Sequence, residues 1–349
     1  MYETNSVNYG FLKRISLILT VFIIFSACSI PITADSPLGG GSGPEPLGGD
    51  PATIQEIISK VTEQDLEKYI TDLQNFGTRY TYAPECNQSA QYIFDEFAIY
   101  PAITVESHYF VYNSQVMRNV IATLPGINAS NNKVYLVAGH YDSYASGNPM
   151  TNAPGADDDA SGTAVALEAA KILSEYKFEA TIKFAAWSAE EVGLIGSQIW
   201  AQEAAESEME IDAYLNFDMI GYDPNNENGL DIRYDSPSQW ISNEMETINA
   251  DYGIGLNITT IKGGGASDHM SFWQQGYQAV SCIEHDFNTP NYHTTTDTVD
   301  KLNMGFDKKV TQLGLATLAK LAGVLTPGVG AVYLDSPAYQ PADTVGITL

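Results

Sequence analysis

Apolar, strand-like segments alternate with amphipathic, helix-like segments over most of the chain, and this alternation constrains the fold more than any other feature. Within residues 132–205, the run NKVYLVAGHYDS precedes SGTAVALEAAKILSEY, and ATIKFAAWSAEE precedes GLIGSQIWAQEAA. Strands that alternate with helices usually lie parallel in one sheet, with helices on both faces. The sequence therefore predicts an α/β protein with three layers, α/β/α, around a mixed, largely parallel central sheet.

Other segments fit the same arrangement. Apolar residues at intervals of three and four predict helices over 54–77, 236–253 and 306–325. Short apolar runs predict strands over 100–112, 115–126, 211–223 and 277–285. The chain shows no internal repeat.

The first 35 residues are typical of a targeting segment. Lys13 and Arg14 precede the apolar run ISLILTVFIIFSAC, which is short for a stable transmembrane helix and indicates a secretory signal peptide. Residues 25–28 resemble the processing box of a bacterial lipoprotein, in which Cys28 would carry the lipid and attach the protein to a membrane. Cleavage near Ala34 without a lipid is the alternative. Both predict a secreted or cell-envelope protein.

The remaining chain divides into three parts. Residues 36–51 form a Gly/Pro-rich linker, 52–326 a globular domain, and 327–349 a tail or the start of a truncated β module. Outside the signal segment, Cys86 and Cys282 are the cysteines of the chain, and the sequence does not show whether they pair. With 43 acidic and 16 basic residues, the net charge of −27 argues against nucleic acid and anionic membrane surfaces as partners.

Ionisable residues follow the apolar part of several predicted strands. His140 and Asp142 follow one strand, Glu190 and Glu191 follow another, and Asp218 lies late in a third. Two loops, APGADDDASG and NTPNYHTTTD, carry more such residues. Because ligands of open α/β sheets bind at the carboxyl ends of the strands, we expect these side chains at one edge of the sheet.

His, Asp and Glu together suit a site for two zinc ions, which needs a bridging carboxylate and separate ligands for each metal. Asp142, two residues after His140, points to the same side of an extended chain and can accept the second imidazole N–H. Of the adjacent glutamates Glu190 and Glu191, one can bind metal while the other meets the metal-activated water. Alternatively, the pair marks a helix start with Ser188 as the N-cap.

Six motifs in order, GHYDS, PGADDDASGTA, SAEEVGLIGS, NFDMIGYD, ASDHMSFWQQGY and YHTTTDT, cover roughly residues 134–321. They resemble the secreted co-catalytic di-zinc aminopeptidases of the bacterial leucyl type. Glutamate carboxypeptidase II and the glutaminyl cyclases are distant members of the same superfamily. The resemblance implies that 52–326 is a di-zinc peptidase domain that removes N-terminal residues from peptides with a free N-terminus.

The resemblance also implies a role for each residue. His140 and Asp218 would bind one zinc, Glu191 and His293 the other, and Asp158 would bridge the two. A cis peptide bond is expected between Asp158 and Asp159. Asp142 would orient a ligand, Glu190 would be the general base, and Tyr292 would either face the nascent oxyanion or form a pocket wall.

The chain departs from the family at the substrate pocket. Its segment IKGGGASDH (261–269) has no cysteine and contains three glycines, which make the loop mobile or leave room for a larger side chain. The candidates for an apolar specificity pocket are Met219, Ile283, Phe287 and Tyr292. His269 is expected to be structural.

Three other functions stay open. A glutaminyl cyclase-like transferase would use one zinc, and an inactive binding module would normally lack ligands. A carboxypeptidase would need basic residues for the substrate carboxylate. The arginines of the chain are Arg14, Arg79, Arg118 and Arg233, and none lies in a motif loop.

Overall fold

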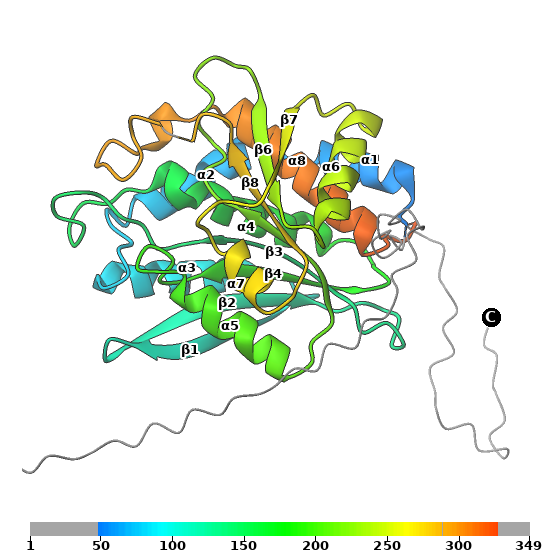
Figure 1. Cartoon of the computed structure of the whole chain (residues 1–349), viewed down its shortest axis with the longest axis horizontal. Coiled ribbons are helices and arrows are strands. Elements are labelled where there is room, and N and C mark those ends of the chain that lie inside the picture. Colours follow the sequence, from blue (N-terminus) through cyan, green and yellow to red (C-terminus); the bar gives the residue numbers. More distant parts are fainter. Residues whose placement is uncertain (1–47, 288, 327–349) are drawn as a thin grey trace, which may run out of the picture. The chain divides into compact units, whose positions relative to one another are not determined.

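The computed structural model describes residues 48–287 and 289–326, which fold around a sheet of eight strands (Figure 1). In chain order the strands are β1 (Thr104–Tyr112), β2 (Gln115–Leu124), β3 (Val134–His140), β4 (Thr181–Trp187), β5 (Ile211–Phe217), β6 (Gly229–Tyr234), β7 (Asn257–Lys262) and β8 (Ala279–Glu284). Their order across the sheet is β1-β2-β4-β3-β5-β8-β6-β7. The pairs β3–β4, β3–β5, β5–β8 and β6–β7 are parallel and the other pairs antiparallel, which confirms the mixed, largely parallel sheet.

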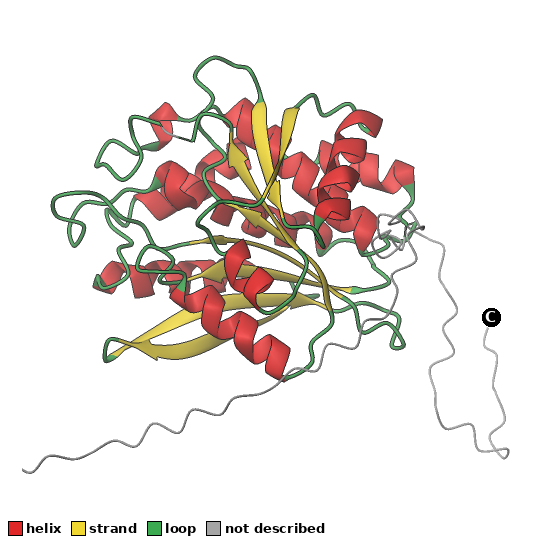
Figure 2. Cartoon of the chain, in the orientation of Figure 1, coloured by secondary structure: helices red, strands yellow, loops and turns green. Residues whose placement is uncertain are grey.

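Helices cover both faces of the sheet and complete the three predicted layers (Figure 2). They are α1 (Pro51–Ser59), α2 (Glu63–Gln74), α3 (Pro84–Ala98), α4 (Gly162–Leu173), α5 (Ile195–Glu206), α6 (Gln239–Asp251), α7 (His269–Gln274) and α8 (Met304–Leu321), with short turns η1 (Ala156–Ser161) and η2 (Val299–Lys301). Helices α5 and α7 lie together on one face, and α4 and α8 pack on β3 from the other.

The two largest apolar cores of the described residues lie on opposite faces of the sheet. The larger core lies between the sheet and the helices α1 to α4, α6 and α8. The smaller core, under α5 and α7, is aromatic: Trp187 of β4 lies 5.3 Å from Trp200 and 5.9 Å from Phe272 between ring centroids. Large buried rings such as these contribute most of the packing energy of a small core.

Some elements differ from the prediction. The helix expected over 54–77 is two helices, because the side chain of Thr62 accepts a hydrogen bond from Asp65 N (3.1 Å) and begins α2 afresh. Helices α3 and α7 and strands β6 and β7 occur where no element was predicted. Helix α7 and strands β6 and β7 have six residues each, so their sequences carry weak periodicity and their position on the sheet determines their conformation.

The chain ends are only partly described. Helix α1 begins at Pro51, capped by Asp50. Cys28, the signal segment 1–35, most of the linker 36–51 and the segment 327–349 lie outside the described residues. Within the described domain, Cys86 and Cys282 are buried free thiols. Among the helices that the structure describes, none has the length and apolar character required to cross a membrane.

Candidate metal centre and substrate pocket

Three adjacent strands end at one edge of the sheet, and each brings ionisable side chains to that edge. His140 is the last residue of β3. Glu190 and Glu191 come shortly after the end of β4, and Asp218 follows β5 directly. Because β4, β3 and β5 are parallel neighbours, their carboxyl ends coincide, as the sequence predicts.

Two loops bring the remaining predicted residues to this edge. Asp158 lies in η1, just before α4, and the peptide bond from Asp158 to Asp159 is cis, as expected. His293 lies in the loop between β8 and α8. The predicted ligands and Glu190 all line one cavity of about 550 Å³.

The carboxylate of Asp158 lies between the two histidines. Its Oδ1 is 3.2 Å from His140 Nε2, and its Oδ2 is 3.1 Å from His293 Nε2. Asp218 Oδ1 is 3.7 Å from His140 Nε2, and Glu191 Oε2 is 3.0 Å from His293 Nε2. The arrangement is the one that a carboxylate shared between two metals requires, with a histidine and a further carboxylate on each side.

Glu190 lies close enough to His140 and Asp218 to be a metal ligand itself. Two sets of donor atoms each lie within 4.8 Å of one another: those of His140, Glu190 and Asp218, and those of Asp158, Glu191 and His293. Glu190 Oε2 is 3.9 Å from His140 Nε2. The ligand and base roles of the two glutamates therefore remain predictions that substitution can separate.

The charge of the cluster fits a bound cation. Glu191 Oε1 is buried and has no hydrogen-bond partner among the described residues, which is costly for a carboxylate unless a cation approaches it. Burial and the charge of Asp158 raise the pKa of Glu191 to about 8. Burial lowers the pKa of His293, but its hydrogen bonds to Asp158 and Glu191 outweigh this and raise the pKa to about 10. Imidazole and carboxylate are the ligands that zinc prefers at catalytic sites.

Asp142 has a different partner from the expected one. His140 Nδ1 is 3.0 Å from the main-chain carbonyl oxygen of Asp142 and 3.7 Å from its carboxylate. The carboxylate instead accepts hydrogen bonds from Thr81 Oγ1 (2.5 Å), Glu190 N (3.1 Å) and Glu191 N (3.4 Å). Asp142 therefore orients the imidazole through its main chain, and its side chain holds the backbone of the glutamate pair.

Three further carboxylates fix the loop around Asp158. Asp159 Oδ2 accepts a hydrogen bond from His140 N (2.9 Å). Asp157 Oδ1 accepts one from the main chain just after β5 (2.9 Å). Asp297 accepts from the main-chain N–H groups of Asp157 (2.9 Å) and Asp158 (3.1 Å). The outer acids of the DDD run are thus structural, and Asp297, which lies in the last motif, could have been found there.

Arg79 is a second residue near the site whose role the sequence did not reveal. Its buried guanidinium donates to the carbonyl oxygens of Tyr141 (2.7 Å), Pro154 (2.6 Å) and Gly155 (2.7 Å). These carbonyl groups belong to the segment that directly follows His140 and to the loop that carries Asp158. Their distance from Arg79 in sequence explains why no local pattern indicated the contact.

The four residues predicted for the specificity pocket, Met219, Ile283, Phe287 and Tyr292, all line the same cavity. Arg233, on β6, lines it as well. The sequence argument against carboxylate recognition therefore does not hold. An arginine reaches the pocket from a strand rather than from a motif loop.

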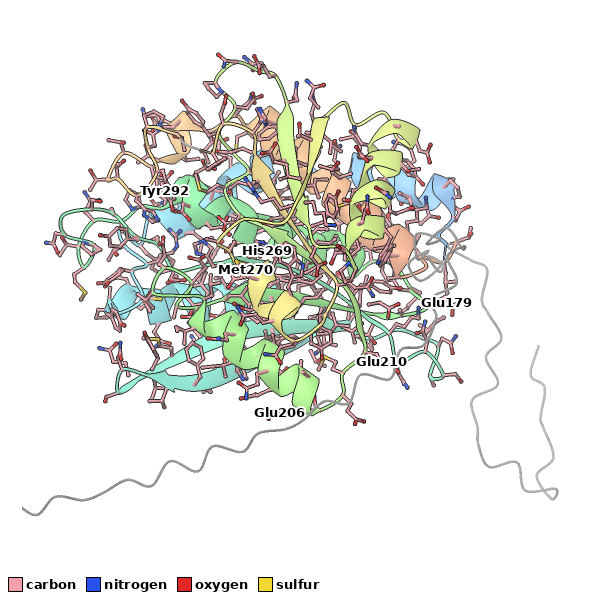
Figure 3. The ribbon with its side chains drawn as sticks, in the orientation of Figure 1. Glu179, Glu206, Glu210, His269, Met270 and Tyr292 are labelled. Carbon is pink, nitrogen blue, oxygen red and sulfur yellow. The ribbon has the colours of Figure 1, made fainter. Side chains whose placement is uncertain are left out.

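Two aromatic neighbours of the centre are seen in Figure 3. The ring of Tyr292 stacks on His293 with centroids 3.9 Å apart, and its side chain remains 45% exposed. His269, at the start of α7, packs edge-on against Trp273 (4.6 Å) and belongs to neither donor set. These positions fit a structural His269 and leave both expected roles of Tyr292 open.

Together, the fold and the site define a class: a three-layer α/β protein with a histidine–carboxylate centre at the carboxyl ends of its parallel strands. The sequence model of peptidase family M28 matches residues 119–318, more than half of the chain. The chain belongs to this family and is accordingly a peptidase of the hydrolase class.

Similarity to named proteins supports the assignment to this family. The chain is 30% identical over 294 residues to leucine aminopeptidase 1 of Ajellomyces capsulatus (strain NAm1 / WU24), with 78% of this chain and 74% of the relative covered. It is 28% identical over 334 residues to a probable zinc metalloprotease of Pyrenophora teres f. teres, with 77% and 68% covered. LapB of Legionella pneumophila shares the fold, with a TM-score of 0.72 at 22% identity over 81% of this chain and 78% of LapB.

Proposed function

We propose that the protein is a zinc-dependent aminopeptidase with two Zn²⁺ ions, which releases N-terminal residues from peptides that have a free N-terminus. One observation carries the proposal: the carboxylate of Asp158 contacts His140 and His293 with its two oxygens. A single carboxylate between two donor sets could be shared by two metals if each set holds one. The similarity to leucine aminopeptidase 1 supports the choice of substrate.

In this proposal His140 and Asp218 hold one zinc, Glu191 and His293 hold the other, and Asp158 is shared. Bound zinc supplies Lewis acidity, which activates a water molecule and polarises the scissile carbonyl group. The donor set of the chain, two imidazoles and three carboxylates, matches the chemistry of zinc ligands.

The remaining steps belong to side chains. Glu190 accepts the proton of the attacking water and delivers a proton to the leaving amine. Its main-chain N–H is held by Asp142 (3.1 Å), which keeps the carboxylate at the centre. Tyr292 is fixed by stacking on His293, and we propose that its phenol donates a hydrogen bond to the developing oxyanion.

A substrate panel tests this function. Aminoacyl amides with a free α-amine are compared with the same compounds after N-acetylation, each with and without a chelator. We expect cleavage of the free amines, little cleavage of the acetylated compounds, loss of activity with chelator and recovery on addition of zinc.

Two results would contradict the proposal. Equal cleavage of free and acetylated substrates would show that the enzyme does not require a free α-amine, which contradicts an aminopeptidase. Cyclisation of N-terminal glutamine without hydrolysis would favour the glutaminyl cyclase alternative, and a second measurement, the number of metals per chain, would distinguish it further.

We also propose that the protein is exported, as a secreted or cell-envelope enzyme. This proposal depends on the basic and apolar residues within 1–35, which lie outside the described part of the chain. Peptides outside the cytoplasm would then be its substrates, and a lipid on Cys28 would attach it to a membrane.

A further inference from the structure

Arg233 lines the substrate cavity, and among the described residues its side chain has no ion-pair partner. Its side chain makes no hydrogen bond and no ion pair with any residue in 48–287 or 289–326, and the guanidinium lies 5.6 Å from the centroid of the Phe287 ring. The protein has 43 acidic residues and a net charge of −27, so an arginine without an acid beside it is unexpected. Arg233 lines the cavity together with the predicted ligands, and its side chain is half-buried.

Two glycines of the loop 263–265, Gly264 and Gly265, lie beside the side chain of Arg233. Gly264 and Gly265 have φ angles of +77° and +88°, which side chains rarely adopt. A Cβ atom at Gly264 would lie 3.1 Å from Arg233 Nη1, and one at Gly265 would lie 3.1 Å from Arg233 Cδ. A Cβ atom at Gly265 would also lie 2.9 Å from His269 Cε1, so the absence of side chains at both glycines lets the loop lie close to Arg233 and His269.

The surroundings of Arg233 indicate the kind of group that binds there. Met219, Ile283 and Phe287 offer apolar walls, and Ser281, opposite Arg233 in the β6–β8 pair, adds a hydroxyl. A guanidinium presents parallel donors that match both oxygens of a carboxylate. A guanidinium beside these apolar side chains suits a carboxylate on a short aliphatic stem.

We infer that Arg233 binds a carboxylate of the substrate. Two parts of a peptide can supply it: an acidic side chain on the N-terminal residue, or the C-terminal carboxylate of a dipeptide. The inference rests on the proposed function, because it assigns specificity to that same site.

The first experiment compares two isosteric N-terminal residues, glutamate and glutamine, on the same neutral leaving amide. If Arg233 receives the side chain, kcat/KM for glutamate exceeds that for glutamine by roughly 10- to 100-fold, the range of a charge-assisted hydrogen-bonded pair. Arg233→Met should reduce this ratio to about 1. Arg233→Lys should keep part of it, because lysine provides a positive charge but not the two parallel hydrogen bonds of a guanidinium.

Lys262→Met is the matched control. Lys262 is exposed at the end of β7, next to β6, and does not line the cavity. The substitution removes a neighbouring positive charge without a contact to substrate. We expect the glutamate-to-glutamine ratio of Lys262→Met to equal that of the wild type. A fall in the ratio equal to that of Arg233→Met would show a diffuse charge effect and overturn the inference.

A second arm tests the other source of the carboxylate. Leucyl-leucine is compared with leucyl-leucinamide, which differs by the C-terminal charge alone. A preference for the free acid that disappears in Arg233→Met would assign Arg233 to the C-terminal carboxylate. A preference confined to N-terminal glutamate would assign it to the side chain. Either result supports a carboxylate-binding Arg233.

A binding measurement keeps the inference separate from catalysis. Free L-glutamate and L-glutamine are titrated into zinc-loaded wild type and Arg233→Met by calorimetry, and their affinity ratio isolates the side-chain carboxylate. If glutamate binds more tightly only when Arg233 is present, the inference stands even if no peptide is cleaved. If neither substrate arm nor binding depends on Arg233 while leucine is still released, the inference fails and the proposed function stands.

Discussion

The adjacent glutamates have separable roles, and isosteric substitution distinguishes them. Glu190→Gln removes a proton acceptor, and Glu190 Oε2 lies 3.9 Å from His140 Nε2, too far for a hydrogen bond. The backbone contact to Asp142 is unchanged, so the structure should be preserved. We expect kcat to fall by about 10²- to 10⁴-fold, or about 3–5 kcal/mol in activation free energy, with metal content unchanged.

Glu191→Gln should behave in the opposite way. Glu191 Oε2 is 3.0 Å from His293 Nε2, and its other oxygen is buried without a partner, so an amide here places an N–H₂ group where a ligand oxygen is needed. This variant should lose one metal and recover part of its activity in excess zinc. The assay is elemental analysis together with kcat on both variants.

Two outcomes would refute the roles assigned to Glu190 and Glu191. If Glu190→Gln loses metal while Glu191→Gln retains it, Glu190 belongs to the ligand set of His140 and Asp218, which the distances within that group also permit. If both variants keep full activity, the pair is only the start of a helical turn.

Three further outcomes are expected. Arg79→Met leaves three buried carbonyl oxygens without their donor and should lower the free energy of unfolding by at least about 2 kcal/mol. The measurement is urea denaturation of the metal-free protein, and an unchanged midpoint would show that Arg79 does not stabilise these loops. Tyr292→Phe should lower kcat by roughly 10- to 100-fold with little change in KM if the phenol meets the oxyanion, and should change KM alone if Tyr292 is only a wall. Cys28→Ser should release the protein from membranes into the soluble fraction, whereas a mature N-terminus beyond Cys28 in mass spectra would exclude the anchor.

The centre could be predicted because its residues obey a rule that sequence shows directly. Ionisable residues that follow apolar strands must meet at one edge when the strands are parallel, and His140, Glu191 and Asp218 do so. The cis bond after Asp158 and the cavity-lining position of Tyr292 came from the resemblance, not from the pattern.

What sequence did not show depends on contacts between distant segments. Arg79 reaches carbonyl groups more than 60 residues away, and Arg233 enters the pocket through a short strand whose position depends on β8. The Asp142 carboxylate turned to the glutamate backbone rather than to His140, a choice that depends on the path of the loop after β4. By contrast, α3 had a usable signal, with proline at its start and buried Cys86, Ala90, Ile93 and Phe97 at helical spacing.

Every role proposed for the site depends on a metal centre shared through Asp158. Zinc per chain, measured by elemental analysis on protein purified without added metal and again after saturation with zinc, tests it directly. We predict two ions per saturated chain for the wild type, one for each donor set. Asp158→Ala should bind fewer and lose activity while its far-ultraviolet circular dichroism is unchanged. A saturated wild type with one zinc and full activity, or an Asp158→Ala protein that is fully active and insensitive to chelator, would contradict the shared centre.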